Sequence, residues 1–204
     1  MDMMTKSLLG KLRRAVPAVA AIVVMTIATG CSAGCSASVS IGHKKTGGTY
    51  SGHGVSLRVP DGWVQSAKTK TTAETGNEIW SQGFGPASGV DFVAVTAYAT
   101  NVAVTQKNAD KYAPKVTVAV KSLVKSAGGT LLSGPKSATI GDMVGYRFET
   151  TFPAKSGETL DGDVLMVWNG RSEYFFNCQY QANGSRKVEI KRGCKTIEST
   201  FKLA

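Results

Sequence analysis

A strong hairpin signal at Asn169-Gly170 constrains the fold more than any other feature of the sequence. The dipeptide separates two strand-like stretches, residues 158–168 and residues 171–180. Asn-Gly favours the tight turn of a two-residue hairpin, so we expect the two stretches to pair in antiparallel fashion. One face of the second strand should then carry Tyr174, Phe176, Cys178 and Tyr180.

Other stretches have the same strand pattern and are bounded by turn residues. The expected strands are residues 55–59, 77–84, 90–99, 137–140 and 143–152. Pro60-Asp61-Gly62 ends the first strand, and Trp63 anchors the return of the chain. The five residues 85–89 join the second and third strands in a hairpin, and Gly141-Asp142 joins the last two.

Two segments have helical spacing instead. Residues 108–127 are expected to form a helix, with Pro114 in its first turn and Gly128-Gly129 at its end. Its apolar stripe consists of Val116, Val120, Leu123, Val124 and Ala127. The final segment repeats this spacing with Ile190, Cys194, Ile197 and Phe201. The fold class predicted is α+β, an antiparallel β-sheet with a central and a C-terminal helix packed on it.

The first thirty residues have the pattern of a secretory signal peptide. A basic start is followed by a thirteen-residue apolar run from Ala15 to Ile27 and then by small residues. As a helix this run would rise about 20 Å, which is short of a bilayer core of roughly 30 Å. We therefore interpret residues 1–30 as a signal peptide and not as a permanent membrane span.

The residues that follow the apolar run suggest lipidation. Ala28-Thr29-Gly30-Cys31 resembles the lipobox of bacterial lipoproteins, in which the cysteine is acylated, for example with palmitate, and becomes the first mature residue. Ala28 stands where the lipobox usually has Leu. Cys35 is a poorer second candidate, and the alternative is an ordinary cleaved signal with two incidental cysteines.

The next segment has the composition of a linker. Residues 31–48 hold almost no large apolar side chain and end in two glycines, so we expect a flexible tether followed by one domain, residues 49–204. The whole chain has 24 Lys and Arg against 14 Asp and Glu. Removing residues 1–30 still leaves a net charge of +7.

The two C-terminal cysteines lie on surfaces that are expected to face each other. Cys178 is on the aromatic face of a strand, and Cys194 is on the apolar stripe of the helix that should cover this face. Four cysteines allow three pairings, and an exported chain permits disulfides. If Cys31 is acylated, we expect a Cys178–Cys194 disulfide; the alternative is two buried thiols.

The basic side chains of the last segment suggest a function more clearly than any other residues of the sequence. Lys187, Lys191, Lys195 and Lys202 form one stripe beside the buried face of the expected helix. We predict that this stripe contacts anionic lipid headgroups or wall polymers, or else an envelope protein. The alternative is that the lysines form an ordinary solvated face whose positive charge is partly offset by Glu198. Nucleic acid is not an expected partner of an exported protein.

Several of these patterns together resemble a known fold family. They are Val55-Ser-Leu-Arg-Val-Pro-Asp-Gly-Trp63, the central helix, Gly145-Tyr-Arg-Phe-Glu149, and the cysteine-bearing strand before the segment from Gly193 to Leu203. About three quarters of the chain resembles the PsbP-like domain of bacterial DcrB-like and actinobacterial lipoproteins. The resemblance implies an accessory or binding subunit of a larger assembly, with no catalytic residue to carry over.

No catalytic or cofactor motif accompanies these patterns. The sequence has no nucleophile elbow, phosphate loop, dinucleotide loop or metal-binding cysteine pair, and its only histidines, His43 and His53, lie near the tether. We expect Asp161 and Asp163 to be solvated and Trp63, Trp80 and Trp168 to pack in the core. No catalytic residue, metal or cofactor is therefore expected.

The sequence favours a non-catalytic binding or accessory protein, lipid-anchored on the extracytoplasmic face of the cell membrane. A carrier that holds a small apolar ligand between sheet and helix is the first alternative, and an unrecognised envelope hydrolase is the second.

Overall fold

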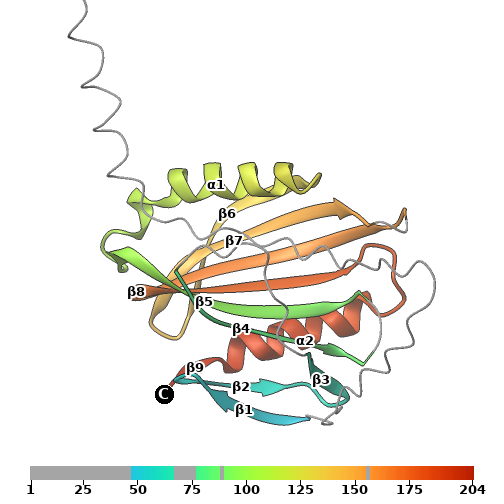
Figure 1. Ribbon diagram of the computed structural model, residues 1–204. Coiled ribbons are helices and arrows are strands. Elements are labelled where there is room, and N and C mark those ends of the chain that lie inside the picture. Colours follow the sequence, from blue (N-terminus) through green and yellow to red (C-terminus); the bar gives the residue numbers. More distant parts are fainter. Residues whose placement is uncertain (1–46, 67–76, 88–89, 155–156) are drawn as a thin grey trace, which may run out of the picture.

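A computed structural model describes residues 47–66, 77–87, 90–154 and 157–204 (Figure 1). The expected signal peptide, Cys31 and Cys35 lie outside the described residues. Thr49, where the domain was expected to begin, lies in the first strand, β1 (Gly48–Gly52).

The main sheet is antiparallel and has the element order β3-β4-β5-β8-β7-β6. Its elements are β3 (Trp63–Ser66), β4 (Glu78–Pro86), β5 (Phe92–Val104), β8 (Thr159–Gln181), β7 (Met143–Pro153) and β6 (Thr130–Ile140). With helices on both faces, this arrangement confirms the α+β class.

The predicted hairpin around residue 170 is present within β8. A backbone hydrogen bond of 2.9 Å from Ala182 to Thr159 joins the two ends of this 23-residue element, which would span about 75 Å if it were extended. The chain must therefore reverse near the middle of this element, close to the predicted Asn169-Gly170 turn. Gly170 adopts a φ of +59°, which suits a tight hairpin turn.

The hairpin of β6 and β7 is longer than predicted. Ile140 pairs with Met143 across the two-residue turn Gly141-Asp142, as expected, and Gly141 has a φ of +54°. However, β6 begins at Thr130 and not at Ser137. Register shifts near Ser133 interrupt the alternation of side chains, which explains why the sequence pattern revealed only the last third of this strand.

The central helix, α1 (Ala113–Ser126), covers one face of the sheet. It begins five residues later than predicted, because Ala109–Lys111 form a short 3₁₀ helix and Pro114 occupies the first turn. The predicted stripe is confirmed: Val116, Val120 and Val124 are buried, and Leu123 and Ala127 are partly buried.

The C-terminal helix, α2 (Lys187–Thr200), packs on the opposite face of the sheet (Figure 1). Ile190, Cys194 and Ile197 are buried as predicted, but the helix ends at Thr200 because Phe201 is extended. A small sheet that the sequence did not reveal in full lies beyond α2 in the order β1-β2-β9, with β2 at Val55–Val59 and β9 at Lys202–Leu203.

Two apolar cores lie on the two faces of the main sheet. Trp63 and Trp80 pack in the core under α2, and Trp168 packs in the core under α1, so the prediction of core tryptophans is confirmed. Both cores and both sheets are built from residues after Gly47. A fragment that begins at residue 36 therefore contains every helix and strand that the structure describes and is expected to fold on its own.

One acidic side chain is buried in the core under α1. Glu173 is 2% exposed, and its Oε2 accepts a hydrogen bond of 2.9 Å from Trp168 Nε1. Its Oε1 has no hydrogen-bond partner. Burial disfavours the charged form and raises the pKa of Glu173 to about 7, although the hydrogen bond from Trp168 opposes this shift.

Candidate binding pocket

The candidate site is lined by side chains of α2, β7 and β8. Gly193 lets the helix approach closely, because a Cβ atom at this position would overlap the ring of Trp63. On β7, Gly145 is equally constrained, since a Cβ atom would overlap the main chain of β8 at Met166. Both glycines belong to motifs that resemble the PsbP-like pattern. Gly193 allows α2 to lie against Trp63 of β3, and Gly145 allows β7 to lie close to β8.

A disulfide joins the helix to the sheet at this place. Cys178 of β8 and Cys194 of α2 are bonded, with their Cα atoms 6.0 Å apart. Both residues are almost fully buried and line the pocket. The predicted bridge is therefore present in the structure.

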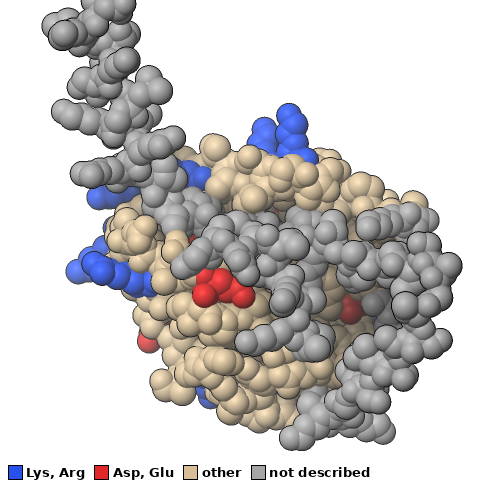
Figure 2. Space-filling view, in the orientation of Figure 1, with Lys and Arg blue, Asp and Glu red and all other residues tan. Residues whose placement is uncertain are grey.

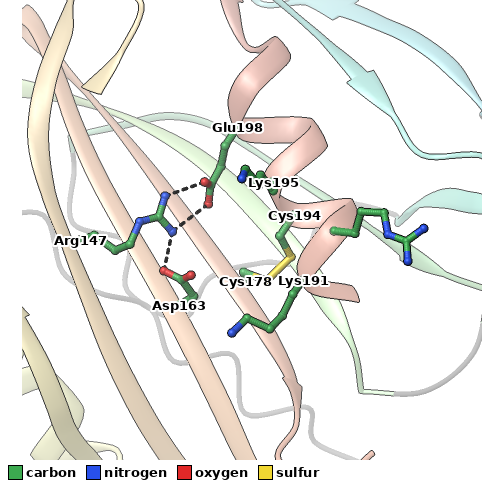
Figure 3. Close-up of a pocket in the computed structure, with 8 residues that line it drawn as sticks. Arg147, Asp163, Cys178, Lys191, Cys194, Lys195 and Glu198 are labelled. Carbon is green, nitrogen blue, oxygen red and sulfur yellow. Dashed lines mark hydrogen bonds and ion pairs between the residues drawn. A yellow bond between two sulfur atoms is a disulfide. The ribbon is translucent and has the colours of Figure 1, made fainter. Parts of the chain in front are cut away.

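Beside the disulfide lies a pocket of about 520 Å³ (Figure 3). Its lining residues come from β7, β8 and α2. They are Arg147, Asp163, Cys178, Lys191, Arg192, Cys194, Lys195 and Glu198. Four basic side chains against two carboxylates leave this lining with a net charge of +2.

Arg147 connects β7 to both neighbouring elements. Its Nη1 lies 2.6 Å from Asp163 Oδ1, and its Nη2 lies 2.6 Å from Glu198 Oε2. A second hydrogen bond of 3.4 Å runs from Nη1 to Glu198 Oε1, so the contact with Glu198 is bidentate. Figure 3 shows the guanidinium pointing at both carboxylates. This cluster fixes the sheet-side wall of the pocket.

The pKa values of the pair reflect its burial. Burial of Glu198, whose side chain is 9% exposed, raises the pKa of this carboxyl, although the hydrogen bond and charge of Arg147 lower it. Burial alone would lower the pKa of Arg147, but the hydrogen bond and charge of Glu198, followed by Asp163, raise it. Arg147 is therefore the partner that makes a charged Glu198 tolerable at this depth.

The sequence-predicted lysine stripe is divided in the structure. Lys187 is held by Asp161, at 2.9 Å, and by the carbonyl of Ala182, at 3.1 Å. Lys191 and Lys195 border the pocket, whereas Lys202 lies in β9, beyond the end of the helix. The four lysines therefore do not form one helical stripe.

The basic side chains on the outer side of the pocket are available to a ligand. Lys191, Arg192 and Lys195 are exposed and make no ion pair with any residue that the structure describes. The ammonium group of Lys191 lies 5.8 Å from the ring centre of Tyr180. These three cations stand beside the Arg147 cluster, whose one guanidinium and two carboxylates carry a net charge of −1, and they can hold an anionic group.

Asp161 and Asp163 are not the solvated loop residues that we expected. Both lie on β8, and each forms an ion pair: Asp161 with Lys187, and Asp163 with Arg147. Arg147 itself was not identified from the sequence. The available signal was a charged residue within the alternating strand Met143–Pro153, but its partners lie 16 and 51 residues further along the chain.

The described lining of the pocket offers no free thiol, no hydroxyl group and no unpaired carboxylate. Its sulfur atoms are joined in the disulfide, and its carboxylates are paired with Arg147. Elsewhere in the described residues, no three His, Cys, Asp or Glu side chains are grouped so that they could hold a metal ion. In the same part of the chain, no helix is long and apolar enough to cross a bilayer.

Comparison with known proteins bears on the fold. No protein-family model matches the sequence, and no curated protein matches it. The chain is similar to LpqN, described as involved in cell envelope biogenesis of Mycobacterium tuberculosis. The sequence identity is 15%, the match covers 74% of this chain and 83% of LpqN, and the TM-score is 0.45. A protein of Bacteroides thetaiotaomicron VPI-5482 has 14% identity over 78% of this chain, which spans 49% of that protein, with a TM-score of 0.47.

A further solved structure superposes better. The cyanobacterial PsbP (CyanoP) of Synechocystis sp. PCC 6803 has 15% sequence identity to this chain, and the match covers 76% of this chain and 91% of CyanoP. The TM-score is 0.53. Together with the α+β architecture described above, this likeness shows that the chain has a PsbP-like fold.

Proposed function

We propose that this protein is a lipid-anchored, extracytoplasmic accessory protein of the cell envelope that binds an anionic partner without catalysing a reaction. Cys31 would carry the acyl anchor, and residues 31–48 would tether the PsbP-like domain to the membrane. The Cys178–Cys194 disulfide supports this location, because such bonds persist in oxidising compartments outside the cytoplasm.

The observation that carries the binding role is the charge of the pocket. Lys191, Arg192 and Lys195 stand unpaired among the described residues around a pocket whose two carboxylates are occupied by Arg147. Such an arrangement attracts a phosphate or carboxylate group. The net positive charge of this lining is the observation that supports an anionic partner.

We expect the folded fragment from residue 36 to bind inorganic phosphate at this pocket in a saturable manner. In an NMR titration, the amide signals of Lys191, Arg192 and Lys195 should shift most, because their side chains would contact the anion. Lys191→Ala combined with Lys195→Ala should weaken binding by at least about tenfold, since each charge-assisted hydrogen bond contributes roughly 1.5–3 kcal/mol.

Lys202→Ala provides the matched control, because Lys202 is an exposed lysine of β9 outside the pocket. This variant should bind phosphate as the wild type does. If the shifted signals map elsewhere, or if the Lys202 and Lys191/Lys195 variants bind equally well, the pocket is not the anion site.

A further inference from the structure

A second cationic surface lies on α1, on the other side of the main sheet from the pocket. Lys115, Lys121 and Lys125 are exposed there and surround Val118, and we call these four residues the α1 lysine face. At about 100° per residue, each lysine lies within about 60° of Val118 around the helix axis. Val116, Val120 and Val124 point the opposite way, into the core.

No acidic side chain compensates this face from within the helix. The sequence of α1, APKVTVAVKSLVKS, contains neither Asp nor Glu. The three lysines make no ion pair with any part of the chain that the structure describes. The nearby Asp110 accepts a hydrogen bond of 3.1 Å from the hydroxyl of Tyr146. Figure 2 shows blue side chains projecting from the edge of the molecule where Figure 1 places α1.

The composition of the α1 lysine face indicates what kind of partner fits it. Specific protein interfaces are enriched in Arg and aromatic residues and depleted in Lys, but this face has lysines and neither Arg nor an aromatic residue. Lysine is a hydrated point charge on a flexible stem, which suits a surface of many mobile anionic groups better than one fixed partner. A bilayer that contains anionic lipids presents such a surface.

Val118 adds an apolar contact at the centre of the face. Val118 is 70% exposed and lies on the same side of the helix as the three lysines. Such an exposed apolar side chain can add a small hydrophobic contact to the electrostatic attraction of the lysines for a bilayer interface.

We propose that α1 docks the domain on anionic phospholipid headgroups through the α1 lysine face. The proposal rests on the proposed function only in that the anchor would keep the domain beside a bilayer. Because α1 and α2 lie on opposite faces of the sheet, docking through α1 would leave the α2 pocket directed away from the lipid. The pocket could then receive its partner while the domain rests on the membrane.

Vesicle cosedimentation of the fragment from residue 36 tests this proposal. At low ionic strength, the fragment should sediment with phosphatidylcholine vesicles that contain phosphatidylglycerol and not with vesicles of phosphatidylcholine alone. Binding should decline as salt shortens the Debye length. Replacing Lys115, Lys121 and Lys125 with Glu should reduce partitioning by at least about 100-fold, given the attraction expected for each lysine.

The matched control replaces Lys191, Arg192 and Lys195 with Glu, which changes the net charge by the same amount on the α2 side. This variant should keep most of its vesicle binding and lose phosphate binding, whereas the α1 variant should show the reverse. A second variant with Gln at Lys115, Lys121 and Lys125 should also lose vesicle binding, and it introduces no new charge that could disturb folding. Thermal midpoints should confirm that all variants fold.

The α1 proposal is overturned if the wild-type fragment ignores anionic vesicles at low salt. Equal losses of vesicle binding in the α1 and α2 variants would also overturn it, because net charge alone would then explain the binding. Capture by a soluble acidic protein without any vesicle binding would assign the face to a protein partner instead. None of these results would change the phosphate titration, which tests the pocket separately.

Discussion

Replacing Arg147 with Met should lower the free energy of unfolding by about 3–5 kcal/mol at neutral pH. Arg147 lies between Asp163 and Glu198, at 2.6 Å from an oxygen of each. Its loss would leave a nearly buried Glu198 without a counter-charge. Urea denaturation of the fragment from residue 36 at several pH values would measure the effect.

The pH dependence of this loss has a definite sign. Burial raises the pKa of Glu198 in the folded state even when Arg147 is present, so the folded state of the variant should bind a proton more readily than the unfolded state. A group of this kind stabilises the fold below its unfolded pKa and loses that contribution as pH rises through its folded pKa. The deficit of Arg147→Met should therefore shrink toward acidic pH.

A double variant separates the cost of an orphaned charge from the value of the ion pair itself. Arg147→Met combined with Glu198→Met removes both charges, and it should recover most of the stability lost in the single variant. If the double variant is as unstable as Arg147→Met alone at every pH, the cluster does not act through the buried charge of Glu198.

Removal of the disulfide should have the second largest effect. Replacing both Cys178 and Cys194 with Ser should lower the free energy of unfolding by about 3 kcal/mol, because the bridge closes a loop with a sequence separation of 16 residues. For a domain of this size, the thermal midpoint should fall by about 6–12 °C. Differential scanning calorimetry of the oxidised wild type and the variant would measure it.

Reduction of the wild-type fragment gives an independent estimate and should bring its midpoint close to that of the double Ser variant. Thiol labelling of the denatured, unreduced fragment should find no free cysteine. Two reactive thiols in oxidised, exported protein, or equal midpoints before and after reduction, would refute a stabilising role for this bridge.

The parts of the fold that sequence reasoning found are those encoded over short distances. The turn at Gly141-Asp142 and the reversal at Gly170 depend on residues that are neighbours in the chain. The buried stripe of α1 follows from helical periodicity alone. By contrast, β9 is two residues long and exists only because Val55 and Ser56 of β2 offer it backbone partners. Such pairing leaves no local pattern.

The same distinction explains what was predicted of the site. Lys191 and Lys195 were found because helical spacing places them beside the buried face of α2. Lys202 was wrongly added to the stripe, because the chain becomes extended at Phe201, with a ψ of 127°. Arg147 and its two carboxylates come from three elements, and only the packing of α2 on β7 and β8 brings them together.

The ion pair between Lys187 and Asp161 explains why the predicted lysine stripe is interrupted on α2. The sequence shows four lysines near one helix face, but it does not show that Asp161 will meet Lys187 across the sheet. The lysines of α1 were not among the binding residues predicted from the sequence. Their lack of an acidic neighbour within the helix is nevertheless visible in the sequence once the bounds of α1 are known.

The intact mass of the protein isolated from its native membranes tests the central proposal, an anchored envelope protein, most directly. We predict a mature chain that begins at Cys31, carries the added mass of acyl chains and retains the Cys178–Cys194 disulfide. The Cys31→Ala variant should remain unprocessed or leave the membrane fraction. A mature chain that begins at another residue and has no added lipid mass would contradict the proposed anchor and, with it, the placement of this domain at the membrane.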